Sequence, residues 1–265
     1  MMVLFLDTVK QKSNRVQQLM EQYESIVLNE LILWQKQMQR SPSLVNRMSR
    51  RLQGKINSYI PEKVHKAITT GIKQMVRAVL FGAELTTREP MVARTLEIRE
   101  AIVNEKISFY KKTAAAEGGL TGAGGLLLGL ADFPIFFGIK MKMLFEIAAC
   151  YGHRVEDYRE RLFLLHIFHL TFSNQDKRRD IYLRMVNWEE TCRALPADIH
   201  QFNWRDFQQE YRDYLDIAKL LQLVPVIGAP VGFVVNYRLI LKLGKTAMNA
   251  YRMRWFNDRK KIESQ

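Results

Sequence analysis

Cysteine is scarce in this 265-residue chain, and the motifs of common enzymes are absent from it. Its two cysteines, Cys150 and Cys192, form no C-x-x-C pair, so thiol redox chemistry and cysteine zinc sites have no support. The sequence contains no G-x-x-x-x-G-K-[ST] phosphate loop, no H-E-x-x-H zinc motif and no G-x-S-x-G nucleophile elbow. We therefore expect no cofactor, and we lean against an enzyme while leaving that question open.

Two histidines come nearest to a metal motif. His166 and His169 lie three residues apart on one predicted helix, which is a spacing that metal ligands use. Their neighbours in the sequence are apolar, and no second motif frames them. We interpret them as core or surface histidines and expect no metal site.

A secretion signal is also lacking. The first residues, MMVLFLDTVKQ, contain no basic segment and only a short apolar stretch, which is too short for a signal peptide. Two isolated cysteines fit a reducing compartment. Both features predict a cytoplasmic protein.

Acidic residues are outnumbered, with 27 acidic against 40 basic residues and a net charge of +13. The excess lies at the two ends, because residues 1–117 carry a net +8 and residues 218–265 a net +7. This balance favours an anionic partner, either phospholipid or nucleic acid. Nucleic-acid binders more often carry one dense basic stripe with exposed aromatic residues, so we expect no nucleic acid.

Two apolar runs are nearly free of charge and rich in glycine or proline. The first, Gly118–Ile139, contains seven of the 14 glycines and one charged residue, Asp132. The second, Leu220–Val235, contains no charged residue. Because glycine is costly inside a helix, we interpret both runs as broken helical hairpins whose backbones pack closely at the centre of the fold. The residues that define them are Gly122, Gly125, Gly129, Asp132, Pro134, Gly228, Pro230 and Gly232.

Asp132 is an acid within an apolar run, and it has two interpretations. Acids in such surroundings often mark function in membranes. Asp132 also has the position of a helix cap, two residues before Pro134, which suits the first turn of a helix. We favour the cap, which predicts a helix over residues 134–151 that Gly152 ends.

Apolar residues recur at steps of three and four through most of the remaining chain, without strand-like alternation and hairpin turns. This pattern predicts an all-α, multi-helix fold in a single domain over residues 1–265. We divide it into basic N-terminal helices at about 1–117, an apolar core hairpin at about 118–152 and C-terminal helices at about 153–265. The other helices expected with the clearest bounds cover residues 15–40, 157–173, 176–193 and 236–256.

Two sets of basic residues each share one face of a predicted helix. The first set lies opposite the apolar stripe of a helix that begins at Pro61, and it consists of Lys66, Lys73 and Arg77. The second set follows steps of four, three and seven on the last helix, and it consists of Arg238, Lys242, Lys245 and Arg252. Few acidic residues are near the second set in sequence, so we do not expect internal ion pairs there. Both sets are predicted to face an anionic membrane surface.

Three blocks of the sequence resemble the EcsC family of bacterial proteins. They are WQKQMQRSPSLVNRMSRRLQGKINSYIPEKVHKAI at 34–68, GLTGAGGLLLGLADFPIFFGIKMKMLFEIAACYG at 119–152 and VPVIGAPVGFVVNYRL at 224–239. The family is named for a gene beside those of an ABC transporter associated with secretion. The resemblance implies ABC transporter subunits as partners, and it supplies no catalytic residue.

These observations lead to one main hypothesis and one alternative. The main hypothesis is a non-enzymatic, cytoplasmic accessory protein, peripheral on the inner face of the cell membrane and linked to an ABC transporter. The alternative is a soluble enzyme or binding protein for a lipid or small anionic ligand, with a pocket between the apolar hairpins.

Overall fold

The computed structural model describes residues 2–40, 70–74, 76–79, 89–122, 133–173, 175–203, 207 and 228–263. Every regular element within these ranges is helical, which confirms the all-α prediction. The α-helices are α1 (Met2–Gln39), α4 (Leu96–Gly122), α6 (Phe133–Cys150), α7 (Tyr158–Phe172), α8 (Gln175–Val186), α9 (Trp188–Ala194) and α12 (Gly228–Glu263). A short 3-10 helix, η2, spans Ile199–Gln201, and residues 70–74 and 76–79 are also helical.

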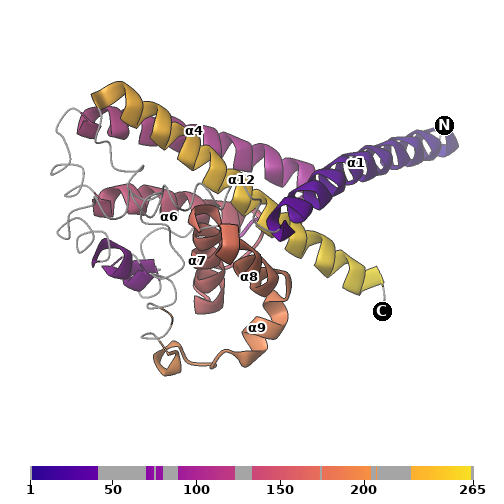
Figure 1. Ribbon diagram of the computed structural model, residues 1–265. Coiled ribbons are helices and arrows are strands. Elements are labelled where there is room, and N and C mark those ends of the chain that lie inside the picture. The colour runs from indigo at the N-terminus through magenta and orange to yellow at the C-terminus, as the bar shows by residue number, and fades with distance from the viewer. Residues whose placement is uncertain are drawn as a thin grey trace.

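The pair α4 and α12 forms the longest helix–helix contact of the described fold (Figure 1). The two helices run antiparallel, because the start of α4 meets the second half of α12. Glu100 of α4 pairs with Arg252, whereas Lys111 lies over the ring of Tyr237. Helix α6 lies against α4, again antiparallel, so α4 is held between two long partners.

One glycine allows α4 and α12 to approach closely. A Cβ atom built on Gly244 would lie 2.6 Å from a side-chain carbon of Ile107, closer than real Cβ contacts occur. Ile107 is β-branched and its side chain turns stiffly, so it cannot move away cheaply. The close backbone contact that the described residues show is therefore at Gly244, an isolated glycine outside both apolar runs.

Helix α7 is the most deeply buried helix. Almost every residue from Tyr158 to Phe172 is buried, against α12, α8 and α6. Its sequence, LFLLHIFHLTF, leaves no polar face, and a helix that is apolar all round belongs in a core. Asp157 caps its start by accepting a hydrogen bond from the backbone N–H of Arg159 at 2.9 Å.

The bounds of α6 match the predicted helix. The helix starts at Phe133 with Pro134 in its first turn, where the missing N–H leaves no bond unmade. At its other end Gly152 adopts a positive φ of 90°, and His153 donates its N–H to the carbonyl of Ala148. This is the glycine-ended cap that Gly152 predicted.

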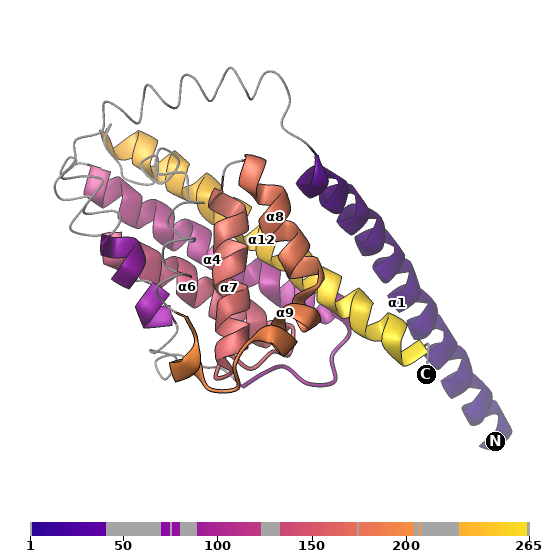
Figure 2. The same ribbon diagram turned by 60° about the horizontal axis from the view of Figure 1, so that its bottom comes forward.

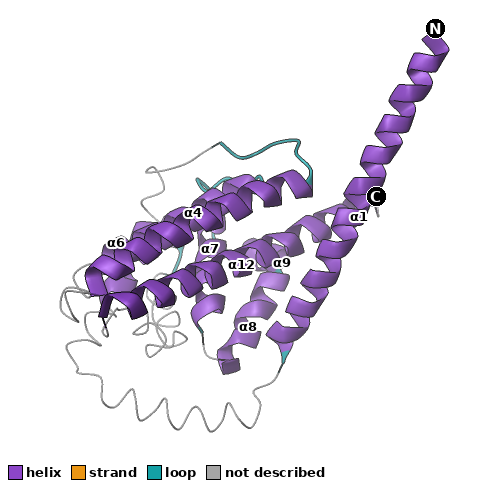
Figure 3. Ribbon diagram, turned by 90° about the horizontal axis from the view of Figure 1, so that it is seen from above, coloured by secondary structure: helices purple, strands orange, loops and turns teal. Residues whose placement is uncertain are grey.

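Helix α1 packs on the body with one half and projects from it with the other (Figures 2 and 3). Val27 and Leu31 are buried, and Trp34 meets Tyr182 of α8 edge to face. This part of α1 contacts α12, α8 and α4. The projecting part extends the predicted helix 15–40 back to Met2.

The described part of the second apolar run, residues 228–235, differs from its prediction. Helix α12 begins at Gly228, so Pro230 and Gly232 lie inside a helix and do not break it. Pro230 is the third residue of α12, where the backbone N–H would have no partner within the helix. Only Gly122, Pro134, Gly228, Pro230 and Gly232 of the predicted hairpin set lie within described helices.

The predicted contact between the two apolar runs stays a prediction. Gly125, Gly129 and Asp132 lie outside the described residues. The antiparallel register of α4 and α12 does bring their ends together, because Gly122 ends one helix where Gly228 begins the other. Among the helices of the described ranges, none is both long and apolar enough to cross a membrane.

Candidate functional site

A buried carboxylate, Glu100, is the centre of a hydrogen-bond network among α1, α4, α12 and the turn that follows α6. Its side chain is 0% exposed and accepts two hydrogen bonds from Arg252, at 2.7 Å to one oxygen and 2.6 Å to the other. The hydroxyls of Tyr23 and Tyr151 donate to the same carboxylate at 2.8 and 3.0 Å. Four donors therefore satisfy an acid that would otherwise be costly to bury.

A second buried carboxylate, Glu160 of α7, lies next to this network. It accepts hydrogen bonds from Tyr251 at 2.6 Å and from Arg254 at 2.7 Å. The rings of Tyr151 and Tyr251 stack at a centroid distance of 5.2 Å, which joins the two carboxylate groups into one cluster. Glu100, Glu160 and the side chains that bond to them connect α1, α4, α7, α12 and the turn that follows α6.

Burial shifts the pKa values of two tyrosines and one histidine in this cluster. It raises the pKa values of Tyr151 and Tyr251 well above 10, and the adjacent carboxylates raise them further. His153 stacks on Tyr251 and lies 3.8 Å from Glu160. Burial lowers the pKa of His153 from 6.5 to about 4, although Glu160 acts in the opposite direction.

The donors and acceptors of this cluster are already engaged with one another. Each oxygen of Glu100 and Glu160 has a side-chain donor within the fold. Four donors occupy the acceptor sites of Glu100, and Tyr251 and Arg254 each bond to one oxygen of Glu160. We therefore interpret the cluster as structural and do not assign it a catalytic role.

Arg252 was predicted to face a membrane, and this prediction is wrong. It is 7% exposed and forms the bidentate pair with Glu100, while its Nη1 donates to Glu30 of α1 at 2.9 Å. Both partners are remote in sequence, so the local lack of acidic residues did not reveal them. Burial lowers the pKa of Arg252, but the hydrogen bonds and charge of Glu100 outweigh that effect and raise it overall.

Lys242 has a structural contact that its sequence position did not predict. Its Nζ donates to the backbone carbonyl of Thr171 at 2.6 Å, at the end of α7. A cation at a helix C-terminus satisfies an open carbonyl and complements the helix dipole. Lys242 thus helps to hold α7 against α12, whatever else its charge does.

The other predicted cations are exposed where the structure describes them. Lys73 and Arg77 lie on the helical residues 70–74 and 76–79, and Arg238 and Lys245 lie on α12. None of these four forms an ion pair with a residue in the described ranges. Lys66 lies outside those ranges.

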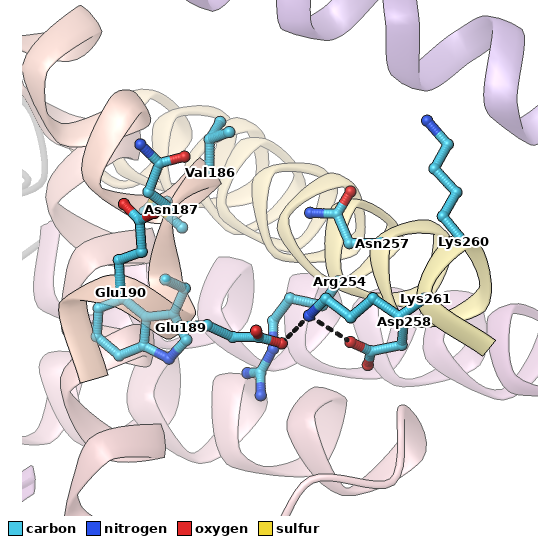
Figure 4. A pocket seen from close by; sticks show the side chains of 11 residues that line it. Val186, Asn187, Glu189, Glu190, Arg254, Asn257, Asp258, Lys260 and Lys261 are labelled. Atoms are coloured by element: carbon cyan, nitrogen blue, oxygen red, sulfur yellow. Dashed lines mark hydrogen bonds and ion pairs between the residues drawn. The ribbon is translucent and has the colours of Figure 1, made fainter. Parts of the chain in front are cut away.

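A cleft of about 530 Å³ lies between the α8–α9 corner and the last turns of α12 (Figure 4). Lys261 reaches between Glu189 and Asp258 and bonds to the first of them, and Arg254 pairs with Glu160. The charges around the cleft are thus largely matched within the protein. No predicted hairpin or basic-set residue lines it, so it is not the pocket that the alternative hypothesis expected.

The two histidines of α7 lie in the core. His166 is 9% exposed and donates from Nδ1 to the carbonyl of Leu162 at 2.8 Å. His169 is 5% exposed, and burial together with His166 lowers its pKa well below 6.5. Over the part of the chain that the structure describes, no three His, Cys, Asp or Glu residues lie close enough to hold a metal ion.

Sequence reasoning missed Glu100, Glu160 and Gly244. A signal for the first existed, because Glu100 falls on the same helical side as the apolar residues Leu96, Val103 and Ile107. An acid on a buried stripe needs a buried cation, and the search for that partner would have pointed to an arginine on another helix.

Comparison with known proteins places the chain among bacterial relatives. A profile of the EcsC protein family matches residues 25–256. "Protein EcsC" of Bacillus subtilis (strain 168) is 41% identical over 230 residues, which cover 86% of this chain and 94% of that protein. "Uncharacterized protein YdbA" of the same organism is 26% identical over 256 residues, covering 88% and 93%. No solved structure matches the chain.

Proposed function

The chain belongs to the EcsC protein family, and we propose that it acts as a non-enzymatic accessory protein on the anionic inner surface of the cell membrane. It is cytoplasmic and peripheral in this proposal. Its basic side chains bind lipid headgroups, and it performs no reaction of its own. The resemblance to the family adds an ABC transporter as the expected neighbour at that surface.

The observation that supports the proposal is how the cations are distributed. Arg252 and Arg254 pair with acids inside the fold, and Arg259 and Lys261 pair with acids at the surface. Exposed cations such as Arg238 and Lys245 have no acidic partner among the described residues. Each basic residue near an anionic membrane contributes about 1 kcal/mol to binding, so unpaired surface cations favour such a partner.

Vesicle flotation of the full-length protein tests the proposal. We expect the protein to float with phosphatidylglycerol-containing vesicles at low salt, and to remain unbound with pure phosphatidylcholine vesicles. High salt should weaken the binding, because screening shortens the reach of surface charges. A protein that stays at the bottom of the gradient with anionic vesicles at low salt would contradict the proposal.

The expected depth of binding is shallow. Alkaline carbonate should release the protein from cell membranes without detergent. If only detergent releases it, the peripheral part of the proposal is wrong. The proposed association with a transporter is tested separately, by co-purification of the transporter subunits with the tagged protein from mildly solubilised membranes. If the subunits do not co-purify, the association with the transporter is wrong, whereas the lipid-binding proposal is unaffected.

A further inference from the structure

Helices α4 and α12 together present a cationic surface that neither helix shows alone. Lys111 of α4 lies with its ammonium 4.6 Å from the ring centroid of Tyr237 on α12, which fixes the two helices level with each other at this point. Lys112 follows on α4, Arg238 follows Tyr237 on α12, and Lys245 lies two turns further on the same side of α12. We call the set Lys111, Lys112, Arg238 and Lys245 the α4–α12 basic face.

The cations of the α4–α12 basic face are available for a partner. Lys112, Arg238 and Lys245 are exposed, and none forms an ion pair with a residue that the structure describes. Two other cations of the same helix are engaged within the fold: Lys242, between Arg238 and Lys245, bonds to Thr171, and Arg252 pairs with Glu100. The structure thus reduces the four-residue set expected on α12 to its two outward members and adds two lysines from α4.

The apolar neighbours of the α4–α12 basic face favour lipid over nucleic acid. Val234 is 44% exposed and lies one turn before Arg238. The end of α4 and the start of α12 both fall inside the apolar runs, which carry no charge over residues 118–131 and 220–235. Cations that flank apolar segments suit an interface with headgroups and acyl chains. The aromatic ring beside them, Tyr237, has Lys111 over it, so it is not an open stacking platform for bases.

We infer that the α4–α12 basic face is the surface through which the protein binds an anionic bilayer. This inference depends on the proposed function and names the residues that bind the lipid headgroups. The first predicted basic set lies elsewhere. The helical residues 70–74 and 76–79, which hold Lys73 and Arg77, lie across α6 from the α4–α12 pair (Figures 1 and 2). The two surfaces can therefore be tested separately.

Neutralising variants of the full chain test the inference by co-sedimentation with phosphatidylglycerol-containing vesicles. The face variant is Lys112→Gln, Arg238→Gln and Lys245→Gln, with Lys111 kept because of its contact with Tyr237. Each cation near an anionic surface contributes about fivefold to binding, so the triple variant should bind about 100-fold more weakly. The matched control is Arg179→Gln, Arg193→Gln and Lys260→Gln, which removes the same charge from exposed positions on α8, α9 and the end of α12. Circular dichroism should show both variants folded.

The outcomes separate the face from the function. A large loss for the face variant with a small loss for the control supports the inference. Equal losses for both would mean that only net charge matters, and the inference fails while membrane binding stands. A loss confined to Lys73→Gln with Arg77→Gln would also overturn it. If the wild-type chain does not bind vesicles at all, the proposed function is wrong, and the inference that depends on it is wrong too. If the wild-type chain instead binds duplex or single-stranded nucleic acid and the face variant does not, the α4–α12 basic face binds nucleic acid.

Discussion

The pair between Glu100 and Arg252 should be the most sensitive point of the fold. Both side chains are nearly inaccessible, at 0% and 7% exposure, and two hydrogen bonds of 2.7 and 2.6 Å join them. Replacing Arg252 with Met leaves a carboxylate buried with only two tyrosine hydroxyls for support. Breaking a buried pair in this way costs about 3–5 kcal/mol, because the remaining charge keeps its desolvation penalty.

A double-mutant cycle separates the pair energy from simple loss of packing. Arg252→Met and Glu100→Leu should each destabilise the chain by about 3 kcal/mol or more. The double variant removes both charges, so it should cost less than the sum of the two by about 2–3 kcal/mol. Some loss will remain, since Tyr23 and Tyr151 then lack their acceptor. The exposed Arg238→Met is the control and should change stability by less than about 0.5 kcal/mol.

The assay is urea unfolding followed by circular dichroism and by tryptophan fluorescence. Coincident transitions from the two probes are needed before a free energy is assigned to either. An Arg252→Met chain within about 1 kcal/mol of the parent would refute the reasoning. So would single-variant costs that simply add, because additivity means that the two side chains do not share one interaction.

Two further predictions concern single sites. Gly244→Ala should destabilise the fold by about 1–3 kcal/mol, because the added Cβ would press on Ile107. Gly138→Ala on α6 should stabilise it by about 1 kcal/mol, because the added Cβ would meet nothing within 4 Å and alanine favours the helix. If urea unfolding shows Gly244→Ala to be the more stable variant, this reasoning is wrong. Stability should fall as the pH drops from 6.5 towards 4, because His153 is protonated in the unfolded chain, whereas in the fold burial and the charges of Arg254 and Arg99 lower its pKa against the opposing effect of Glu160. The contribution of His153 is at most about 3 kcal/mol, and a His153→Gln chain with the same pH dependence as the parent would exclude it.

Local signals predicted those parts of the fold that depend on neighbouring residues in the chain. Gly152 ends α6 with a positive φ, as predicted, because this kind of cap depends on residues within one helical turn. The predicted helix over residues 157–173 corresponds to α7, Tyr158–Phe172. Helix lengths were less predictable, since α12 starts eight residues before the expected Asn236 and runs through Pro230 and Gly232.

Tertiary contacts decided the features that the sequence could not predict. Arg252 and Glu100 are 152 residues apart, and no local pattern connects them. The glycine-rich run between Gly118 and Ile139 was predicted to be the place of close packing. The tight contact among the described residues is instead at Gly244, an isolated glycine opposite Ile107. Whether a glycine marks a close approach depends on the residue across the interface, which a single sequence does not identify.

The two ends of α12 show why one helical face can have two roles. The steps from Arg238 to Lys245 to Arg252 do place these side chains on one side of α12, as periodicity predicted. Over the second half of the helix α1 covers that side, and its Tyr23 and Glu30 join the bonds around Arg252 and Glu100. In the first half, Arg238 and Lys245 on that side are exposed and have no described acidic partner. A membrane-facing role for this stripe is therefore confined to the half of α12 that begins in the second apolar run. This is also the half whose cations can be replaced without removing a buried ion pair.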